Sequence, residues 1–77
     1  MKALVELVAR GIVDHPEAVE VRVVDGPHMT TVEVQVSPED VGKMIGRGGR
    51  VIKAIRTVAR AAATRTGKRV NVEILRP

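Results

Sequence analysis

The chain has 77 residues, a net charge of +4, and no cysteine, phenylalanine, tyrosine or tryptophan. Without cysteine, a domain of this size has no disulfide or thiolate zinc site to stabilise it, so its core must come from Val, Ile, Leu, Ala and Met. No segment approaches the roughly 20 consecutive apolar residues of a membrane span, so we expect a single domain, over residues 1–77, outside the membrane.

The first predicted element is an amphipathic helix over residues 2–14. Its apolar residues have the spacing of three and four that places side chains on one helical face: Leu4, Leu7, Val8 and Ile12. The segment Asp14-His15-Pro16 ends the helix, because the residue before a proline disfavours helical backbone angles. Charges at Glu6, Arg10 and Asp14 interrupt the apolar residues too often for a signal peptide, so we expect a cytoplasmic protein.

Two strands joined by a turn are predicted next. Residues 18–24 and 31–36 alternate apolar and polar side chains, with the period of two that is typical of a strand with one buried face. Between them, Asp25-Gly26-Pro27 is a turn signal. The pair is therefore predicted to form an antiparallel hairpin.

Two helices and a third strand complete the predicted order. The segment Ser37-Pro38-Glu39-Asp40 has the residue types of a helix start, with the serine as the expected cap. This helix is short because glycines soon follow; a second helix is predicted over residues 49–66 and a third strand over residues 70–74. The order α-β-β-α-α-β predicts an α+β fold, in which a three-stranded mixed sheet has three helices on one face.

The outer face of the predicted sheet has no aromatic side chain and more acidic than basic residues. Its expected residues are Glu20, Arg22, Thr31, Glu33, Gln35, Asn71 and Glu73. A sheet that binds RNA in the manner of the RNA-recognition motif needs aromatic residues on that face to stack bases. The sequence excludes that mode of binding, so a nucleic acid would have to bind elsewhere.

The two halves of the sequence differ strongly in charge. Residues 1–40 hold 3 basic and 8 acidic side chains, whereas residues 41–77 hold 10 basic and 1 acidic. Between Lys43 and Arg69 there are nine cations and no acid. This asymmetry favours a polyanionic partner, with nucleic acid as the first choice, over an ordinary solvated basic helix.

The predicted second helix has one apolar and one basic face. Its apolar face is expected to contain Val51, Ile55, Val58, Ala59 and Ala62. Its opposite face is expected to contain Arg50, Lys53, Arg56 and Arg60. The cations at positions 56, 60 and 65 are expected either to guide a nucleic acid strand or only to solvate the helix.

A glycine-rich loop separates the two predicted helices. It contains Gly46, Arg47, Gly48 and Gly49, followed by Arg50 at the helix start. Glycine allows close approach of another chain, and the free amides at a helix start bind phosphate. A tight turn between helices would explain one or two of the glycines but not the arginine, and neither the P-loop nor the dinucleotide fingerprint fits. We therefore expect this loop to bind a phosphate backbone.

The segment from Ile45 to Ile55, IGRGGRVIKAI, resembles the I-G-x-x-G-x-x-I-x-x-I signature of K-homology (KH) domains. The element order is similar to the prokaryotic type II arrangement over nearly the whole chain. The resemblance implies a stand-alone bacterial single-stranded RNA-binding protein and RNA chaperone, which acts in the cytoplasm with a larger Jag-like partner or as a homodimer. It also implies roles in cell-length control and cell-wall homeostasis. Gly48 departs from the polar residue common at its position, which leaves more of the phosphate contact to amides and Arg47.

The resemblance also implies a groove for bases beside the loop. Its candidate lining residues are Val41, Met44, Ile45, Val51 and Ile52. Each of the five is also plausible as a core residue, and for Ile45 and Val51 the core is the better interpretation. Further basic candidates around the groove are Lys43, Lys53, Lys68 and Arg69.

Other functions are less consistent with the sequence. The single serine, Ser37, is explained as a cap, and His15 and His28 lie beside turn prolines without metal-ligand spacing, so we expect no enzyme activity, cofactor or metal. A protein-interaction or dimerisation module, with RNA contact supplied mainly by a partner, stays open as an alternative. Binding of single-stranded DNA is a second alternative, because nothing in the sequence reports on the 2′-hydroxyl.

Overall fold

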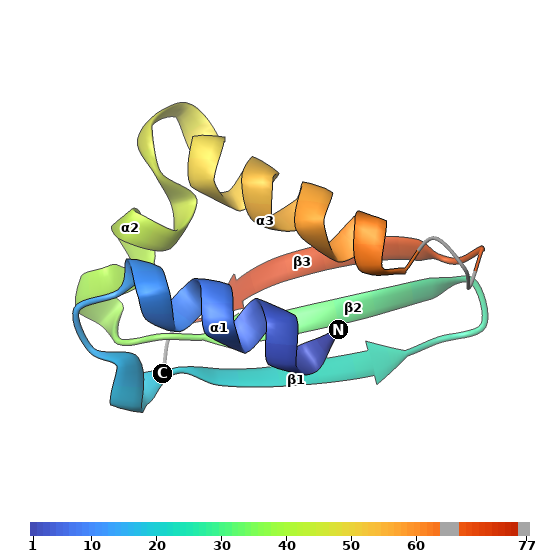
Figure 1. Cartoon of the computed structure of the whole chain (residues 1–77), viewed down its shortest axis with the longest axis horizontal. Helices are drawn as coiled ribbons and strands as arrows, with labels where there is room; N and C mark the ends of the chain where they lie inside the picture. Colours follow the sequence, from blue (N-terminus) through green and yellow to red (C-terminus); the bar gives the residue numbers. More distant parts are fainter. Residues whose placement is uncertain (64–66, 76–77) are drawn as a thin grey trace.

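The computed structural model describes residues 1–63 and 67–75. In chain order it contains α1 (Lys2–Ile12), β1 (Glu20–Asp25), β2 (Met29–Gln35), α2 (Val41–Ile45), α3 (Arg50–Ala62) and β3 (Arg69–Leu75), with short 3-10 turns η1 (Pro16–Ala18), η2 (Pro38–Asp40) and η3 (Arg47–Gly49). The predicted α+β class and the order α-β-β-α-α-β are confirmed. The three helices lie on one face of the sheet (Figure 1).

The sheet has the order β1-β2-β3. β1 and β2 form the predicted antiparallel hairpin, and β2 pairs with β3 in parallel, in a register that aligns Val32 with Val72. A parallel pair needs a long crossover, and η2, α2, η3 and α3 provide it. Because the crossover stays on one side of the sheet, it places the glycine loop above the end of β3 (Figure 1).

The core is built almost entirely from valine and other aliphatic side chains. Val32 and Val34 on the inner side of β2, and Val36 directly after it, are completely buried, and they alternate with half-buried polar residues. A fully buried side chain of this size stabilises the fold by about 1.5–3 kcal/mol. Closely packed valines thus take the place of aromatic residues in the core.

The buried face of α3 differs from the predicted one. The buried residues are Ile52, Ile55, Ala59 and Ala63, whereas Val51 and Val58 are half-buried and Ala62 is exposed. The reason is that α3 has two neighbours: the sheet on one side and α1, whose Val8 and Ile12 share a groove with Val51 and Val58, on the other. The prediction that α3 continues to residue 66 falls on residues 64–66, outside the described residues.

The segment before α2 also departs from the prediction. Ser37 precedes the 3-10 turn η2 rather than an α-helix, and its side chain makes no capping hydrogen bond. The Asp40 amide instead donates to the Ser37 carbonyl at 2.8 Å. Asp40 itself is buried, which an acidic residue tolerates only with hydrogen-bond partners.

Candidate nucleic-acid interface

The glycine loop connects α2 to α3 through backbone angles that favour glycine. Gly46, Gly48 and Gly49 all have positive φ values, of 76°, 64° and 78°. At Gly46 a Cβ atom would also lie 2.9 Å from the backbone nitrogen of Val51 and would collide with its side chain. The turn geometry alone therefore accounts for all three glycines, rather than for the one or two expected from the sequence, so their number is not itself a sign of phosphate binding.

The loop nevertheless offers donors where a phosphate can approach. The Gly46 and Gly49 amides donate to the carbonyls of Gly42 and Gly46, at 2.9 and 3.1 Å. The first amides of a helical turn have no acceptor within the turn, and in η3 these are the amides of Arg47 and Gly48. A Cβ atom built on Gly48 has no heavy atom within 4 Å, so this side of the loop is open.

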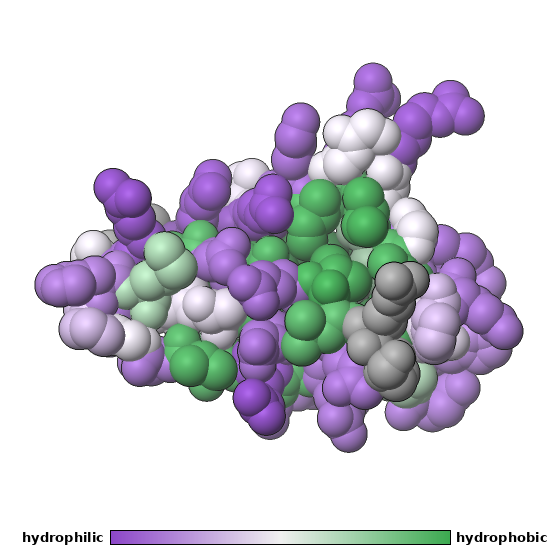
Figure 2. Space-filling view, turned by 180° about the vertical axis from the view of Figure 1, so that it is seen from behind, coloured by the Kyte–Doolittle hydropathy of each residue, from purple (hydrophilic) through white to green (hydrophobic). Residues whose placement is uncertain are grey.

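Cations without a carboxylate partner continue from the loop along α3, and one more stands at the first residue of β3. We call them the unpaired cation row: Arg47, Arg50, Lys53, Arg56, Arg60 and Arg69. Within residues 1–63 and 67–75, none of them lies within 4.0 Å of a carboxylate oxygen. Figure 2 shows hydrophilic side chains along the upper edge of the molecule, over α3.

The helical geometry of α3 explains this placement. Successive residues are about 100° apart on the helix, so Lys53 and Arg60 lie on the flank opposite Val51 and Val58. Since Val51 and Val58 share a groove with α1, Lys53 and Arg60 occupy the flank that turns away from α1, whereas Arg50 is among the residues that line this groove. Lys53 and Arg60 therefore lie on the side of α3 beside β3, the edge strand of the sheet.

The apolar candidates of the groove divide into exposed and buried residues. Ile45 is 41% exposed beside the loop, although the core was the better interpretation of its sequence position. Met44 is 0% exposed and Ile52 is 8% exposed, so the expectation that they line a surface groove is corrected: both belong to the core. Val41 and Val51 are half-buried against the core. In Figure 2, apolar side chains gather below the glycine loop, beside the end of β3.

Two cations expected to contact RNA are paired with acids in this structure. Lys43 forms an ion pair with Asp14, whose hydrogen bond raises the pKa of Lys43 and lowers the pKa of Asp14. Lys68 donates to Asp25 at 2.8 Å, and this bond, together with one from Thr30, lowers the pKa of Asp25. Both lysines are thus held by partners from the acidic half of the chain.

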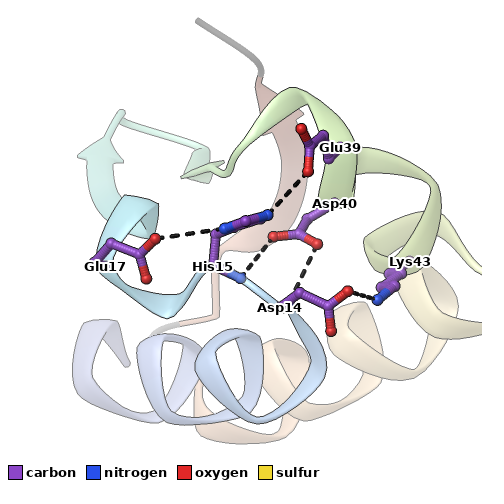
Figure 3. A network of polar contacts seen from close by, with 6 residues as sticks. All are labelled: Asp14, His15, Glu17, Glu39, Asp40 and Lys43. Carbon is purple, nitrogen blue, oxygen red and sulfur yellow. Dashed lines mark hydrogen bonds and ion pairs between the residues drawn. The ribbon is translucent and has the colours of Figure 1, made fainter.

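A polar network on the other side of α2 was not found from the sequence. We call it the Asp40 network: Asp14, His15, Glu17, Glu39, Asp40 and Lys43 (Figure 3). The buried Asp40 accepts hydrogen bonds from the backbone amides of Asp14, at 3.2 Å, and His15, at 3.0 Å. It thereby ties the segment after α1 to the start of α2, which precedes the glycine loop.

The His15 ring extends this network outward. Its Nε2 lies 3.0 Å from Glu39 Oε2, and its Nδ1 lies 3.5 Å from Glu17 Oε1. The hydrogen bond with Glu39 raises the pKa of His15, with smaller contributions from the charges of Asp40, Glu39 and Glu17. The only sequence signal for this network is the pair of acids before α2, which resembles an ordinary helix start.

The described part of the chain contains neither a metal-binding cluster nor a membrane-spanning helix. No group of three or more His, Cys, Asp or Glu side chains in it is arranged to hold a metal ion. Among the helices described, none is both long enough and apolar enough to cross a membrane. The glycine loop, the unpaired cation row and the apolar residues beneath them are the site to be explained.

Comparisons with known sequences agree on one family. A family model of the KH domain of KhpA and KhpB matches residues 2–74. The RNA-binding protein KhpA of Clostridium perfringens is 53% identical over 75 residues, which cover 97% of this chain and 100% of that protein. The RNA-binding protein KhpA of Aquifex aeolicus is 40% identical over 75 residues, which cover 97% of this chain and 95% of that protein.

Solved structures share the fold at lower identity. A variant of Era from Aquifex aeolicus bound to GDP and aluminium fluoride superposes with a TM-score of 0.61 at 18% identity. Era in complex with MgGDPNP and a segment of 16S ribosomal RNA superposes with a TM-score of 0.62, also at 18% identity. Each match covers 97% of this chain but only 29% of the Era chain, so the likeness supports the fold alone.

Proposed function

Because this chain belongs to the KhpA/KhpB family of KH domains, we propose that it binds single-stranded RNA, with the glycine loop holding the phosphate backbone. The observation that carries the proposal is the unpaired cation row. The other described lysines and arginines all have an acid within 4.0 Å: Lys2, Arg10, Arg22, Lys43 and Lys68. The cations left without partners are concentrated around the loop and α3, where a polyanion can neutralise them.

The proposed binding mode follows from the loop geometry. The amides of Arg47 and Gly48, with the Arg47 and Arg50 side chains, hold successive phosphates of a strand of about four nucleotides. Bases lie over Ile45 and the apolar surface beneath the loop, and Lys53 contacts the strand one turn further along α3. The chain has no aromatic residue, so stacking of about 1–3 kcal/mol per base is absent. Affinity is therefore modest and strongly dependent on salt.

The finer functional statements rest on family membership. We propose that the protein acts in the cytoplasm as an RNA chaperone, and that it works with a larger KhpB/Jag-like protein in cell-length control and cell-wall homeostasis. The similarity to proteins named RNA-binding protein KhpA, over 97% of this chain, supports the RNA-binding part of this role. No catalytic step, cofactor or metal is part of the proposal. A second module in the same assembly would raise the modest affinity through effective concentration.

The first test measures RNA binding by an Arg47→Glu variant. Fluorescence anisotropy with a labelled, unstructured RNA, and with its DNA equivalent, is recorded at about 150 mM salt, where charges more than about 8 Å apart are largely screened. The matched control is Arg10→Glu, which makes the same charge change at an exposed position of α1. We expect Arg47→Glu to weaken RNA binding by about tenfold, or about 1.4 kcal/mol, and Arg10→Glu to leave it nearly unchanged.

The result decides between the candidate binding modes. If both variants bind RNA as the wild type does while circular dichroism shows them folded, the loop is not the phosphate site. If both lose affinity equally, only the overall charge attracts RNA. Equal binding of the DNA oligomer would show that the site does not read the 2′-hydroxyl and would extend the proposal to single-stranded DNA.

A second candidate function, a dimerisation module, is favoured by the groove between α1 and α3. Val8 and Ile12 of α1 line it together with Val51, Ala54, Ile55 and Val58 of α3, and Arg50 is the one charged residue in its lining, so its surface is almost entirely apolar. Leu7, elsewhere on α1, is 71% exposed. The occupant that we propose is a second copy of this chain. Light scattering after size exclusion tests it: a dimer that Ala54→Glu converts to a folded monomer supports this function, and a monomeric wild type contradicts it.

A further inference from the structure

The four lysines of the chain differ in whether an acid contacts them. Lys2, Lys43 and Lys68 each have a carboxylate oxygen within 4.0 Å. Lys53 is exposed on α3 and has no such partner within residues 1–63 and 67–75. Among the described residues it is therefore the one lysine whose side chain no carboxylate binds.

An acidic partner lowers the reactivity of a lysine toward acyl groups. The amine attacks an acyl group through its lone pair, which only the neutral form has, whereas a bonded carboxylate stabilises the protonated form. Lys43 shows this effect, because its hydrogen bond with Asp14 raises its pKa. We therefore expect Lys53 to react more readily than the three lysines that have acidic partners.

Two arginines flank Lys53 on the surface of α3. Arg50 precedes it by three residues and Arg56 follows it by three, and side chains three residues apart on a helix are neighbours. A guanidinium group stays charged at neutral pH and matches the geometry of a phosphate. Neither arginine has a carboxylate within 4.0 Å in the described ranges. A small molecule with a phosphoryl group is therefore attracted to the neighbourhood of the Lys53 amine.

We propose that Lys53 is an acylation site, which acyl phosphates modify directly. Arg50 and Arg56 hold the phosphoryl group while the neutral amine attacks the carbonyl carbon. A bond forms between Nζ and this carbon, and the bond from the carbon to the phosphate oxygen breaks. Inorganic phosphate leaves and takes the proton that the nitrogen loses. The product is a neutral amide in place of a cation.

Acylation of Lys53 also changes the surface proposed to bind RNA. Lys53 belongs to the unpaired cation row, and the proposed binding mode gives it a contact with the strand. Loss of its charge removes one phosphate contact, so the acylated protein binds RNA more weakly. This consequence rests on the proposed function, whereas the reactivity of Lys53 does not.

The first experiment measures the reaction without RNA. The protein is incubated with acetyl phosphate, and peptide mass spectrometry follows acetylation of each lysine. We expect Lys53 to react about fivefold faster than the other three, the factor that two exposed charge contacts can supply. Arg50→Gln/Arg56→Gln should reduce this preference, and the matched control Arg10→Gln/Arg22→Gln, which removes the same charge elsewhere, should retain it. Acetic anhydride has no phosphoryl group, so with this reagent the preference should be smaller.

The second experiment measures RNA binding after the reaction. The matched control is Lys53→Arg, which keeps the positive charge but has no amine to acylate, so that reaction at the other lysines is the same in both proteins. We expect the treated wild type to bind the labelled RNA severalfold more weakly than before. Its slope of log Kobs against log salt should be shallower by about 0.7, the value for one phosphate contact with a single strand. Treated Lys53→Arg should bind as it did before treatment.

The outcomes separate the acylation site from its effect on RNA. Equal acetylation of all four lysines by acetyl phosphate would overturn the site. A preference for Lys53 that acetic anhydride reproduces in full would overturn the role of the arginines and leave exposure as its cause. Unchanged RNA affinity of the acetylated wild type would overturn the effect on binding but not the site. If the untreated protein binds no RNA, the proposed function fails, while the acetylation pattern still decides whether Lys53 is an acylation site.

Discussion

The two sides of α2 differ in how their charges are paired. In the Asp40 network, His15 and Lys43 each contact carboxylates, and a buried carboxylate binds two backbone amides. In the glycine loop and α3, the unpaired cation row has no acidic partner among the described residues. The comparison teaches that charge alone does not mark a binding surface. What distinguishes the proposed site is positive charge that the fold itself leaves without a partner.

The largest expected effect is on stability, at Asp40. Replacing Asp40 with Ala leaves the amides of Asp14 and His15 without their acceptor, and hydrogen bonds to a charged group contribute about 1.5–3 kcal/mol each. We expect the free energy of unfolding to fall by about 3 kcal/mol, measured by urea denaturation. Glu39→Ala, at the exposed neighbouring position, should cost less than about 1 kcal/mol. Equal small losses in the two variants would show that Asp40 does not hold this side of α2.

The next largest effect is a difference in stability between alanine variants of two glycines in the same loop. Gly46→Ala combines a backbone region that is essentially restricted to glycine (φ 76°, ψ 170°) with a collision against Val51, so we expect a loss of about 2–3 kcal/mol. Gly48→Ala has a left-handed backbone (φ 64°, ψ 18°) in open space and should cost about 1–2 kcal/mol. Thermal denaturation of both variants measures the difference. If Gly48→Ala proves the more destabilising, the loop does not have this conformation in solution.

Much of the fold could be predicted because its signals are local. The valines of β2 repeat every second residue, so this strand reveals its buried face without knowledge of its neighbours. In α1 the spacing of three and four predicted the helix but not its buried face, because Val5 and Ala9 are buried whereas Leu4 and Leu7 are exposed. The face of α3 was predicted less well, because both the sheet and α1 cover it. A helical wheel gives the angle between side chains but not which flank a second helix covers.

The pairing of charges could not be predicted for a related reason. Lys43 contacts Asp14 across 29 residues of sequence, and Lys68 contacts Asp25 across 43. Sequence position places both lysines near the proposed RNA surface, and only the fold brings their acids beside them. The hydrogen bonds of Asp40 could not be predicted for the same reason, because the backbone amides that it binds lie 25 and 26 residues earlier in the chain.

A smaller effect, on RNA affinity and its salt dependence, tests the difference between paired and unpaired cations. Arg50→Gln and Lys43→Gln each remove one positive charge close to the glycine loop, but only Lys43 has an acidic partner. We expect Arg50→Gln to weaken RNA binding severalfold and to reduce the salt slope by about 0.7, the value for one phosphate contact with a single strand. Lys43→Gln should leave the slope nearly unchanged. A larger change for Lys43→Gln would mean that RNA displaces Asp14, and the distinction between the two regions would not predict binding.

The smallest expected effect is the pH dependence contributed by His15. Its pKa is raised in the folded protein, chiefly by the hydrogen bond to Glu39 and further by the charges of Asp40 and Glu17. A raised pKa means that the protonated ring stabilises the folded state fully below the unfolded value of about 6.5, and that this contribution is lost as pH rises through the folded value. We therefore expect stability to decrease slightly above pH 6.5, and the decrease to disappear in His15→Gln.

Proton NMR of the His15 ring measures the pKa directly, and Glu39→Gln should shift it back toward the unfolded value. Because the ring and Glu39 are exposed to solvent, raising the salt concentration should reduce the shift, since screening weakens the attraction. RNA binding should depend on Arg47 both below and above the pKa of His15, because His15 lies in the Asp40 network and not in the unpaired cation row. A loss of RNA affinity that follows the His15 titration, and that His15→Gln abolishes, would instead show that the two sides of α2 are coupled through Asp40.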